Sequence, residues 1–555
     1  MKIVRIKQVL IVSLLIVSVL FLFAFKKEVD FSTSKSLDIF FSFFRDLNVF
    51  YVDKTDPEKL IRVGIDAMLQ SLDPYNEFVP EESKEQFDFQ TTGEYGGMGA
   101  LIRYGVNYPV VSEVYEGTPS HKAGILVGDT IIYIDNISVK NLTVQKVSNL
   151  LKGAPKTELS VTVRRIGVAD SLVFNFRREK IHLPSIPFYG IVNNNVGYIK
   201  LINFTAESSK DVEEKVEGLI NGMGAKYLIF DLRGNPGGLL YEAVKIVNLF
   251  VEKNQLVVYT KGQIDEFDNK YETQTKPLDT TIPLAILVDR ASASASEIVA
   301  GALQDLDRAI IIGERTFGKG LVQATRPLPY NTQVKITTAK YYIPSGRCIQ
   351  AVDFTQRNED GSISYIPDSL INEFTTKNGR IVYDGGGITP DILIEQSYYS
   401  RIASILYTNN YFFEYATIYH YGNRGKDVYP RNFKLSEREY DVFIDFLKTK
   451  NFKYQSQTEQ ILQDLTQAAK SENYLETIQP LIDSLQGVIE LNRMNDFDLY
   501  KKEIKALLEE EIVSRYSFQR GRTEYEVSND SIIQLSTDIL RNKARYNEIL
   551  TTGVN

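Results

Sequence analysis

Cysteine is nearly absent from this chain, since Cys348 is the single one among 555 residues. One cysteine excludes a disulfide within the chain and any metal site built on a Cys-x-x-Cys pair. The chain also lacks a basic surplus, because 63 Lys and Arg residues face 71 Asp and Glu residues, for a formal net charge of −8. Phosphate binding needs a basic face, so we do not expect nucleic acid to be the main partner.

Internal repeats and low-complexity tracts are also missing. Apolar residues make up 43% of the chain and charged residues 24%, so every part of it can bury a core. A chain of this length is too long for one ordinary domain and should divide into roughly three or four units.

One long hydrophobic run lies near the N-terminus, over residues 9–25, between Lys2, Arg5 and Lys7 on one side and two lysines on the other. Its length suits either a signal peptide or a signal anchor, and residues 1–28 are assigned to it. No small-x-small cleavage site follows, which favours an uncleaved anchor. The basic leader should stay in the cytoplasm, which places the body outside, on the periplasmic side of the inner membrane, anchored or released, if the source has two membranes.

Four further segments follow, and their patterns predict a multidomain α+β protein. Residues 29–90 show helical spacing of apolar side chains and predict a small helical domain. Residues 91–180 hold short β-rich runs with one helix at 144–151, which predicts a compact β-rich module. Strands and helices alternate over 181–397, which predicts βα units with a largely buried sheet. Residues 398–555 are rich in Glu, Lys, Leu and Tyr and are predicted to be mainly helical.

The alternation in the third segment is specific enough to name its elements. Strands are predicted at 196–204, 227–233, 284–289 and 309–314, and helices at 208–221, 239–251 and 296–305.

Two glycine-rich stretches imitate phosphate-binding loops. Residues 96–99 (GGMG) precede a strand-like run, whereas a dinucleotide loop should open a helix. Residues 313–320 (GERTFGKG) differ by one residue from a P-loop, but Gly320 replaces the Ser or Thr that binds Mg²⁺. Neither stretch predicts nucleotide binding.

A third glycine-rich stretch, DLRGNPGG at 231–238, lies between a buried strand and an amphipathic helix. Backbone N–H groups at such a turn suit an anion. The oxyanion of an acyl-transfer intermediate needs the same donors as a phosphate. A tight βα turn without any ligand stays open as the alternative.

A serine cluster, ASASASE at 291–297, lies at the next strand-to-helix turn. A hydroxyl held at such a turn is well placed as a nucleophile, with the next N–H available to the oxyanion. Ser294 and Glu297 also fit a capping box, so the alternative is that these serines only mark the start of a helix.

A serine nucleophile needs a base, but the three histidines, His121, His182 and His420, all lie outside the alternating segment. A Ser-His-Asp triad is therefore not expected. A lysine can serve instead when burial lowers its pKa toward neutrality. Lys319 is the candidate, because it lies in a Gly-Lys-Gly turn between apolar strands.

With these motifs in their order, the chain resembles the carboxyl-terminal processing peptidases, also called tail-specific proteases. The matching motifs run from SLDPYNEFVP at 71–80 to GGGITPDI at 385–392, and the resemblance as a whole extends over about residues 37–395. The resemblance implies a peptidase core of the ClpP/crotonase-like type with an embedded PDZ domain, and it implies no metal or organic cofactor.

The resemblance also assigns the catalytic roles. Ser294 is the nucleophile, Lys319 the general base, and Gln323 the group that orients the lysine. The N–H groups of Gly237 and Ala295 form the oxyanion hole, with the glycine assignment open between Gly237 and its neighbour Gly238.

The segment 93–178 is similar to the PDZ domain of these proteases. Such a domain captures the C-terminal carboxylate of a substrate and adds the substrate's tail to a sheet edge. The carboxylate loop implied here is Gly97, Met98, Gly99 and Ala100. A PDZ-like fold that only packs structurally is the alternative.

The function expected from all this is serine endopeptidase activity on polypeptides with accessible C-terminal tails. Two alternatives are a catalytically silent peptide-binding scaffold and an acyl hydrolase that is not a peptidase. Residues 398–555 match no motif. Three roles stay open for them: a homo-oligomer interface, an adaptor docking surface or part of a substrate tunnel.

Overall fold

The structure is a computed structural model of the chain, and it describes residues 31–357, 363–395 and 398–552. The predicted export segment at 1–28 lies outside the described residues. No helix within the described ranges has the length and apolar character needed to cross a membrane. The chain divides into two compact units that meet between Phe78 and Val79.

The first unit contains the two helices predicted by the helical spacing, α2 (Phe31–Phe50) and α3 (Pro57–Gln70). Helix α3 begins at Asp56, whose carboxylate accepts the Lys59 N–H at 3.2 Å, followed by Pro57 in the first turn. Strand β1 (Glu77–Val79) and helix α4 (Lys84–Thr92) follow along the chain.

The predicted β-rich module is confirmed as an antiparallel sheet with two short helices, α5 (Pro119–Ala123) and α6 (Val144–Leu151). Its strands in sheet order are β3 (Ala100–Arg103), β4 (Val110–Val114), β5 (Thr130–Ile134), β7 (Glu158–Arg164) and β8 (Leu172–Arg177), with β6 (Ile137–Ser138) beside β5. Strand β3 is an edge strand of this sheet. A separate ladder of β2 (Glu94–Gly97) with β9 (Glu179–His182) joins the entry and exit of the module.

A mostly parallel sheet forms the centre of the second unit, as the alternating segment predicts. Its strands in order are β10 (Phe188–Val192), β11 (Val196–Lys200), β12 (Tyr227–Asp231), β15 (Leu284–Val288), β16 (Ile310–Gly313) and β23 (Ile392–Leu393), with β10 alone antiparallel. All strands but the short last one are largely buried, which explains why their sequences are continuous apolar runs.

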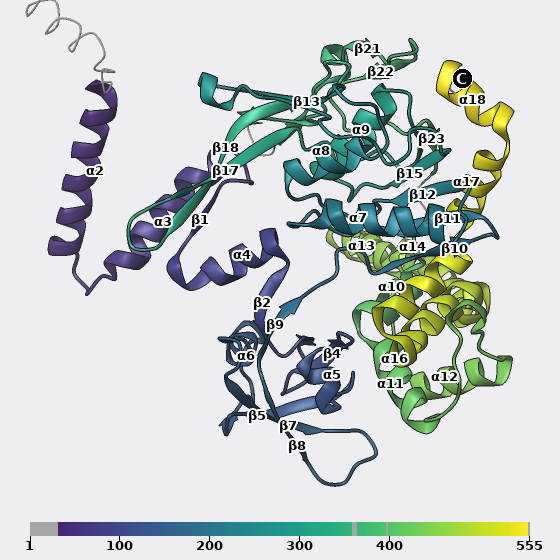
Figure 1. The fold of residues 1–555 in the computed structure, drawn as a ribbon. Coiled ribbons are helices and arrows are strands. Elements are labelled where there is room, and N and C mark those ends of the chain that lie inside the picture. Colours follow the sequence, from purple (N-terminus) through teal and green to yellow (C-terminus); the bar gives the residue numbers. More distant parts are fainter. Residues whose placement is uncertain (1–30, 358–362, 396–397, 553–555) are drawn as a thin grey trace, which may run out of the picture. The chain divides into compact units, whose positions relative to one another are not determined.

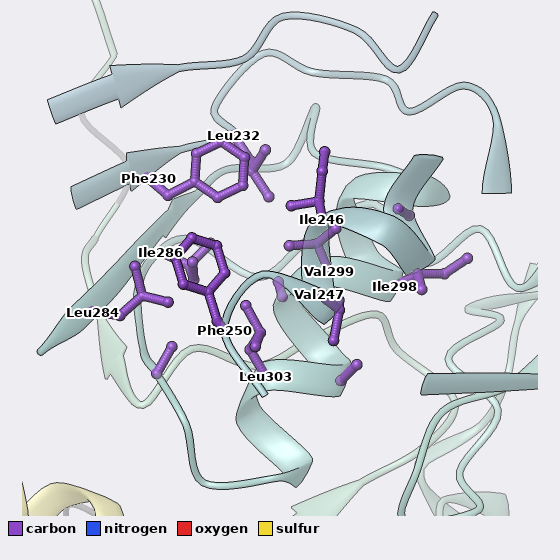
Figure 2. Close-up of a cluster of buried hydrophobic side chains, with 14 of the residues drawn as sticks. Phe230, Leu232, Ile246, Val247, Phe250, Leu284, Ile286, Ile298, Val299 and Leu303 are labelled. Atoms are coloured by element: carbon purple, nitrogen blue, oxygen red, sulfur yellow. The ribbon is translucent and has the colours of Figure 1, made fainter. Parts of the chain in front are cut away.

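One face of this sheet is covered by the predicted helices α7 (Ser208–Glu217), α8 (Leu240–Asn248) and α9 (Ala295–Asp305) (Figure 1). Successive side chains of a strand point to opposite faces. Phe230 and Ile286 therefore meet this helical layer, and Figure 2 shows them facing Val247, Phe250 and Leu303. Complete burial of each such side chain contributes about 1.5–3 kcal/mol.

The opposite face is covered by the last two helices of the chain, α17 (Ser531–Arg541) and α18 (Lys543–Thr552). Ile229 and Leu287 point to this face and share a buried cluster with Ile533, Ile539 and Tyr546. The helical content predicted for 398–555 is confirmed. Its last two helices complete the core of the central sheet, which the sequence pattern did not predict.

A second sheet lies beside the first and carries the strand-like segment after residue 320. Its strands β17 (Leu321–Pro327), β18 (Gln333–Tyr342), β13 (Leu256–Gly262) and β14 (Lys270–Glu272) pair in that order. Two small ladders complete the strands: β19 (Val352–Arg357) with β20 (Ile363–Tyr365), and β21 (Glu373–Thr375) with β22 (Ile381–Tyr383).

Four of the remaining helices form their own buried cluster: α10 (Arg401–Thr408), α11 (Tyr411–Gly422), α12 (Glu437–Thr449) and α16 (Lys501–Asn529). Helix α15 (Asp496–Leu499) packs against this cluster, while α13 (Gln457–Ser471) and α14 (Leu475–Met494) pair with each other. Helix α16 is broken at Ser517 and Phe518, where the backbone leaves the helical conformation. Near this break Phe518 contacts the ring of His121 in the β-rich module, with centroids 5.0 Å apart.

Candidate active site

Two turns meet at the carboxyl ends of β12 and β15, which are parallel neighbours in the central sheet. The glycine-rich stretch 231–238, named here the glycine loop, follows β12, and the serine cluster follows β15. Open α/β sheets place their ligand sites at this edge. The two turns are tied together, because the carbonyl oxygen of Asn235 accepts the Ala293 N–H at 3.1 Å and the Ser296 hydroxyl at 2.9 Å.

Ser294 lies at the first turn of α9 with φ 54° and ψ −111°. A non-glycine residue in such a conformation costs of order 1–3 kcal/mol, and such residues cluster at functional sites. The hydroxyl of Tyr341 donates to the Ser294 carbonyl at 3.2 Å and so helps to fix the turn. The backbone of Ser294 therefore has the sharp strand-to-helix geometry expected for a nucleophile.

Glu297 is fully buried one turn into α9 and accepts the Ser294 N–H at 2.8 Å. This contact is one half of the predicted capping box. The same carboxylate also accepts the Thr316 hydroxyl at 2.6 Å, the Gly318 N–H at 2.7 Å and the Lys319 N–H at 2.9 Å. Glu297 thus links the turn of Ser294 to the turn of Lys319, so the capping and nucleophile interpretations are compatible.

Burial raises the pKa of Glu297 from 4.5 to about 7, because the hydrogen bonds from Thr316 and from the N–H groups of Lys319, Gly318 and Ser294 lower it only in part. The carboxyl group therefore titrates near neutral pH.

The turn that carries Lys319 is closely packed on both sides of the lysine. A side chain on Gly318, which has φ +85°, would lie 2.4 Å from Cβ of Ala351. A side chain on Gly320 would lie 2.8 Å from the backbone N of Gln350, and the Gly320 N–H donates to Oε1 of the same residue at 2.7 Å. Packing thus requires both glycines, and they fix the backbone from which the Lys319 side chain extends.

A cavity of about 510 Å³ brings the predicted catalytic residues together. Ser294, Lys319 and Gln323 all line it, from α9, the Gly-Lys-Gly turn and β17 respectively. Gly237 and Gly238 line it as well, so four separate segments meet at one site. None of the three histidines lines this cavity.

Gln323 lies at an irregularity of the β17–β18 ladder, and its side-chain amide donates to the Thr337 hydroxyl at 3.2 Å. This bond holds the Gln323 side chain in place beside the cavity.

The two glycines at the end of the glycine loop differ in their hydrogen bonds. The Gly237 N–H donates to Oδ1 of Asn235 at 2.9 Å. The N–H groups of Gly238 and Ala295 have no hydrogen-bond partner within the described part of the chain. Gly237 still packs directly on the serine turn, since a side chain there would lie 2.6 Å from the Ala293 carbonyl oxygen and 2.9 Å from Cβ of Ser294.

Asn203 also lines the cavity, and no sequence motif pointed to it. Its Oδ1 atom is buried and lacks a hydrogen-bond partner among the residues that the structure describes. Buried polar atoms are normally paired, so an unpaired acceptor beside Ser294 suits a ligand donor.

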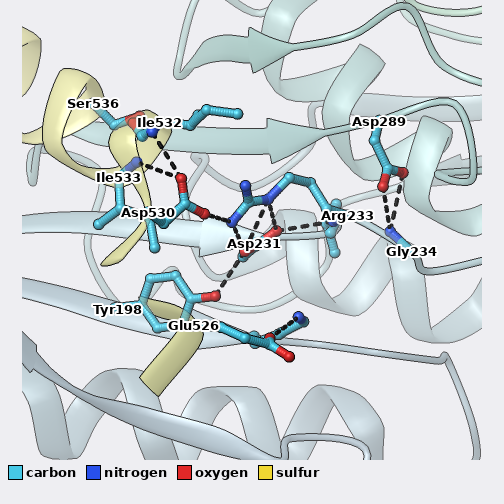
Figure 3. A network of polar contacts seen from close by, with 12 residues as sticks. Tyr198, Asp231, Arg233, Gly234, Asp289, Glu526, Asp530, Ile532, Ile533 and Ser536 are labelled. Carbon is cyan, nitrogen blue, oxygen red and sulfur yellow. Dashed lines mark hydrogen bonds and ion pairs between the residues drawn. The ribbon is translucent and has the colours of Figure 1, made fainter. Parts of the chain in front are cut away.

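An ionic network anchors the start of the glycine loop (Figure 3). The fully buried Asp231 accepts the Tyr198 hydroxyl at 2.6 Å and forms an ion pair with Arg233 at 2.6 Å. Burial alone would raise the pKa of Asp231, but the Arg233 guanidinium, with smaller effects of Lys200 and the Tyr198 hydroxyl, more than offsets it, so this pKa lies below its ordinary value. Arg233 also pairs at 2.7 Å with Asp530, at the start of α17.

The predicted carboxylate loop, Gly97 to Ala100, joins β2 to the edge strand β3. Met98 is buried in the core of the module. Gly99 has φ +79°, and a side chain there would lie 2.3 Å from Cβ of Thr118. Its carbonyl oxygen accepts the Tyr115 N–H at 3.0 Å and the Ser120 hydroxyl at 3.0 Å, which holds the loop beside the edge of the sheet.

Three family models match the chain. The model "Peptidase family S41" matches residues 195–357, "PDZ domain" matches 110–165, and "Probable PDZ-protease, C-terminal helical domain" matches 402–540. The three matches correspond to the central βα segment, the β-rich module and the helical segment described above.

Curated relatives carry names of the same kind. A "Carboxy-terminal-processing protease" from Bartonella bacilliformis is 35% identical over 327 residues, which is 58% of this chain and 75% of that protein. A "Probable CtpA-like serine protease" from Staphylococcus aureus is 35% identical, and the match covers 55% of this chain and 61% of that protein. A "Carboxy-terminal processing protease CtpA" from Bacillus subtilis is 33% identical, with 54% and 63% covered.

Among solved structures, the photosystem II D1 C-terminal processing protease matches with 25% identity and a TM-score of 0.34, over 64% of this chain and 92% of that protein. The family models and curated relatives decide the assignment. The chain belongs to the carboxy-terminal processing protease family, with an S41 peptidase domain, a PDZ domain and a C-terminal helical domain of PDZ-proteases.

Proposed function

We propose that this chain is a serine endopeptidase that uses Ser294 as nucleophile and Lys319 as general base. The observation that carries the proposal is the single cavity lined by Ser294, Lys319 and Gln323 beside the glycine loop. The three side chains come from separate elements, so their convergence is a property of the fold.

The reaction follows from these groups. The Ser294 Oγ attacks the carbonyl carbon of a peptide bond while its proton passes to the amine of Lys319. The C–N bond then breaks, the leaving amine takes that proton, and an ester between Ser294 and the substrate remains. A water molecule deprotonated by Lys319 attacks the ester, which releases the new carboxylate and restores the Ser294 hydroxyl. Gln323 orients the lysine throughout.

The negative charge on the carbonyl oxygen needs two N–H donors at the transition state. Ala295 supplies one of them, directly after the nucleophile. The unpaired N–H of Gly238 supports this residue as the second donor, and Gly237 could replace it only by giving up its bond to Asn235.

The PDZ domain selects substrates through their C-terminal tails. We assign capture of the terminal carboxylate to the loop of Gly97, Met98, Gly99 and Ala100, and pairing of the tail to the exposed edge of β3. The position of β3 at the edge of its sheet supports this assignment.

The unpaired Oδ1 of Asn203, in the cavity of the peptidase domain, would accept a backbone N–H of the polypeptide next to the scissile bond.

Both alternative functions make different predictions. A catalytically silent scaffold would not need Ser294, Lys319 and Gln323 around one cavity. An acyl hydrolase for small thioesters has no use for a PDZ domain, and it would hydrolyse a thioester while leaving an unfolded polypeptide intact.

The place of action is part of the proposal. Residues 1–28 carry the composition of an export signal or anchor, so we assign the body of the protein to the periplasmic side of the inner membrane. Protease accessibility of the folded body in intact spheroplasts, compared with lysed cells, tests this assignment.

A digestion assay tests the activity. A soluble form that begins at Val29 is incubated with an unfolded protein ending in apolar residues, beside the variants Ser294→Ala and Lys319→Ala. We expect cleavage by the wild type and at least a 1,000-fold loss in both variants. Cleavage by the variants at the wild-type rate would show that the site assignment is wrong.

A further inference from the structure

Asp530, in the C-terminal helical domain, contacts the glycine loop. Its Oδ2 atom lies 2.7 Å from Nη2 of Arg233, and both side chains are about four-fifths buried. Its Oδ1 atom accepts the Ile532 N–H at 2.7 Å and so caps α17. One carboxylate oxygen thus stabilises its own helix, while the other holds an arginine of the peptidase domain (Figure 3).

Arg233 connects Asp530 to the glycine loop, which in turn contacts the turn that carries Ser294. Its guanidinium also holds Asp231, and its own N–H donates to Asp231 Oδ1 at 2.9 Å. The next residue, Gly234, donates its N–H to Asp289. Asn235 then binds the serine turn through its carbonyl oxygen and holds the Gly237 N–H with its side chain. The position of the glycine loop therefore depends on a chain of contacts that starts at Asp530.

We propose that Asp530 is a positioning residue for the oxyanion-binding loop, so that docking of the C-terminal helical domain sets the catalytic competence of Ser294. The proposal rests on the proposed function. Asp530 lies 236 residues after Ser294 in the sequence, at the start of a helix of the C-terminal segment that covers the central sheet. Helix α16, which ends directly before Asp530, contacts the PDZ domain through Phe518 and His121, and it contacts the peptidase domain through Glu526 and Lys200, 3.4 Å apart.

The variant Asp530→Asn isolates this role. Asparagine caps helices as well as aspartate does, so α17 keeps its first turn. The charge that holds Arg233 is lost. The matched control is Asp538→Asn, which removes an exposed carboxylate from the same helix, where it only accepts from Gln534. Asp530→Glu, which keeps the charge, should restore part of any loss.

Two readouts separate this inference from the proposed function. Amide hydrogen exchange of a peptide spanning residues 233–238 should be at least 5-fold faster in Asp530→Asn than in Asp538→Asn, at an equal Tm. In the digestion assay kcat should fall about 10-fold with KM unchanged, since a small misplacement can cost up to about 100-fold in rate.

Unchanged exchange in Asp530→Asn would overturn the positioning role, whatever the activity. A Ser294→Ala variant that still cleaves would instead overturn the proposed function, while the exchange result would stand. Faster exchange with unchanged kcat would show that the loop moves without serving catalysis, and this result too would overturn the inference.

Discussion

At the scale of single residues, Glu297 links the two turns that meet at the candidate active site. Its carboxylate accepts four donors from the turns of Ser294 and Lys319. Glutamine at position 297 would keep only one of the two accepting oxygens. Its NH2 group would replace the other oxygen and would face hydrogen-bond donors. We expect Glu297→Gln to lower kcat by about 10- to 100-fold, because both turns lose part of their anchor. Steady-state kinetics measures this, and Glu314→Gln, at a half-buried residue paired with Arg290, is the control.

The pKa of Glu297 also predicts how stability depends on pH. Because burial raises this pKa to about 7 from 4.5, the folded state binds more protons than the unfolded state between these values. The free energy of unfolding should therefore fall as pH rises from 4.5 to 7, by up to about 3 kcal/mol from this group. Urea unfolding of the Ser294→Ala protein at several pH values measures the slope. The slope should flatten when Glu297→Gln is added, and an unchanged slope would contradict the assignment.

Gly237 gives a further prediction at this scale. A methyl group there would meet the Ala293 carbonyl oxygen and the Ser294 side chain, at a φ of +99° that disfavours side chains. We expect Gly237→Ala to lower kcat by about 100-fold or more. Gly234→Ala is the matched control, because Gly234 lies in the same loop at φ +73° with open space around its Cα. Equal activity of the two variants would contradict the close packing of Gly237 on the serine turn.

Several residues that line the candidate site could be located from the sequence, because strand, turn and helix signals are local. Ser294 and Lys319 follow predicted strands, and both line the cavity. The capping-box pattern identified Glu297 as a helix cap, but its bonds to the Lys319 turn depend on how two loops pack. The choice between Gly237 and Gly238 depends on a bond to Asn235, which no sequence pattern reveals.

At the scale of elements, α17 acts as a structural part of the peptidase core. Ile539 is buried against the central sheet, while Gln534 on the same helix is exposed. We expect Ile539→Asp to lower the free energy of unfolding by about 3–5 kcal/mol, because it buries an unpaired charge. Gln534→Asp should change it by less than about 0.5 kcal/mol. Chemical denaturation of the two variants measures the difference, and similar midpoints would contradict the packing of α17 on the sheet.

The strands and helices of the core matched their predicted positions closely, since buried parallel strands are continuous apolar runs. The helix predicted at 296–305, for example, is α9 at Ala295–Asp305. The role of α17 and α18 could not be predicted in the same way. Their amphipathic pattern shows that one face is buried, but it does not say against which sheet.

At the scale of the whole molecule, the proposed function requires two separable sites, one that captures a tail and one that cuts. Gly99→Ala should distort the carboxylate loop, because its methyl group would collide with Thr118. We expect KM for a substrate with an apolar tail to rise at least 10-fold, with no change for a short peptide that only fits the cavity. Gly117→Ala, at φ +77° with open space, is the control. An equal rise in KM for both substrates would contradict the separation of the sites.

The most direct test of the central claim is to locate the nucleophile chemically. The wild type and the Lys319→Ala variant are treated with a fluorophosphonate, digested, and analysed by mass spectrometry of the peptide that carries residues 291–308. We expect an adduct on Ser294 in the wild type and at least 100-fold slower labelling in the variant. An adduct on another residue, or equal labelling of both proteins, would contradict this expectation.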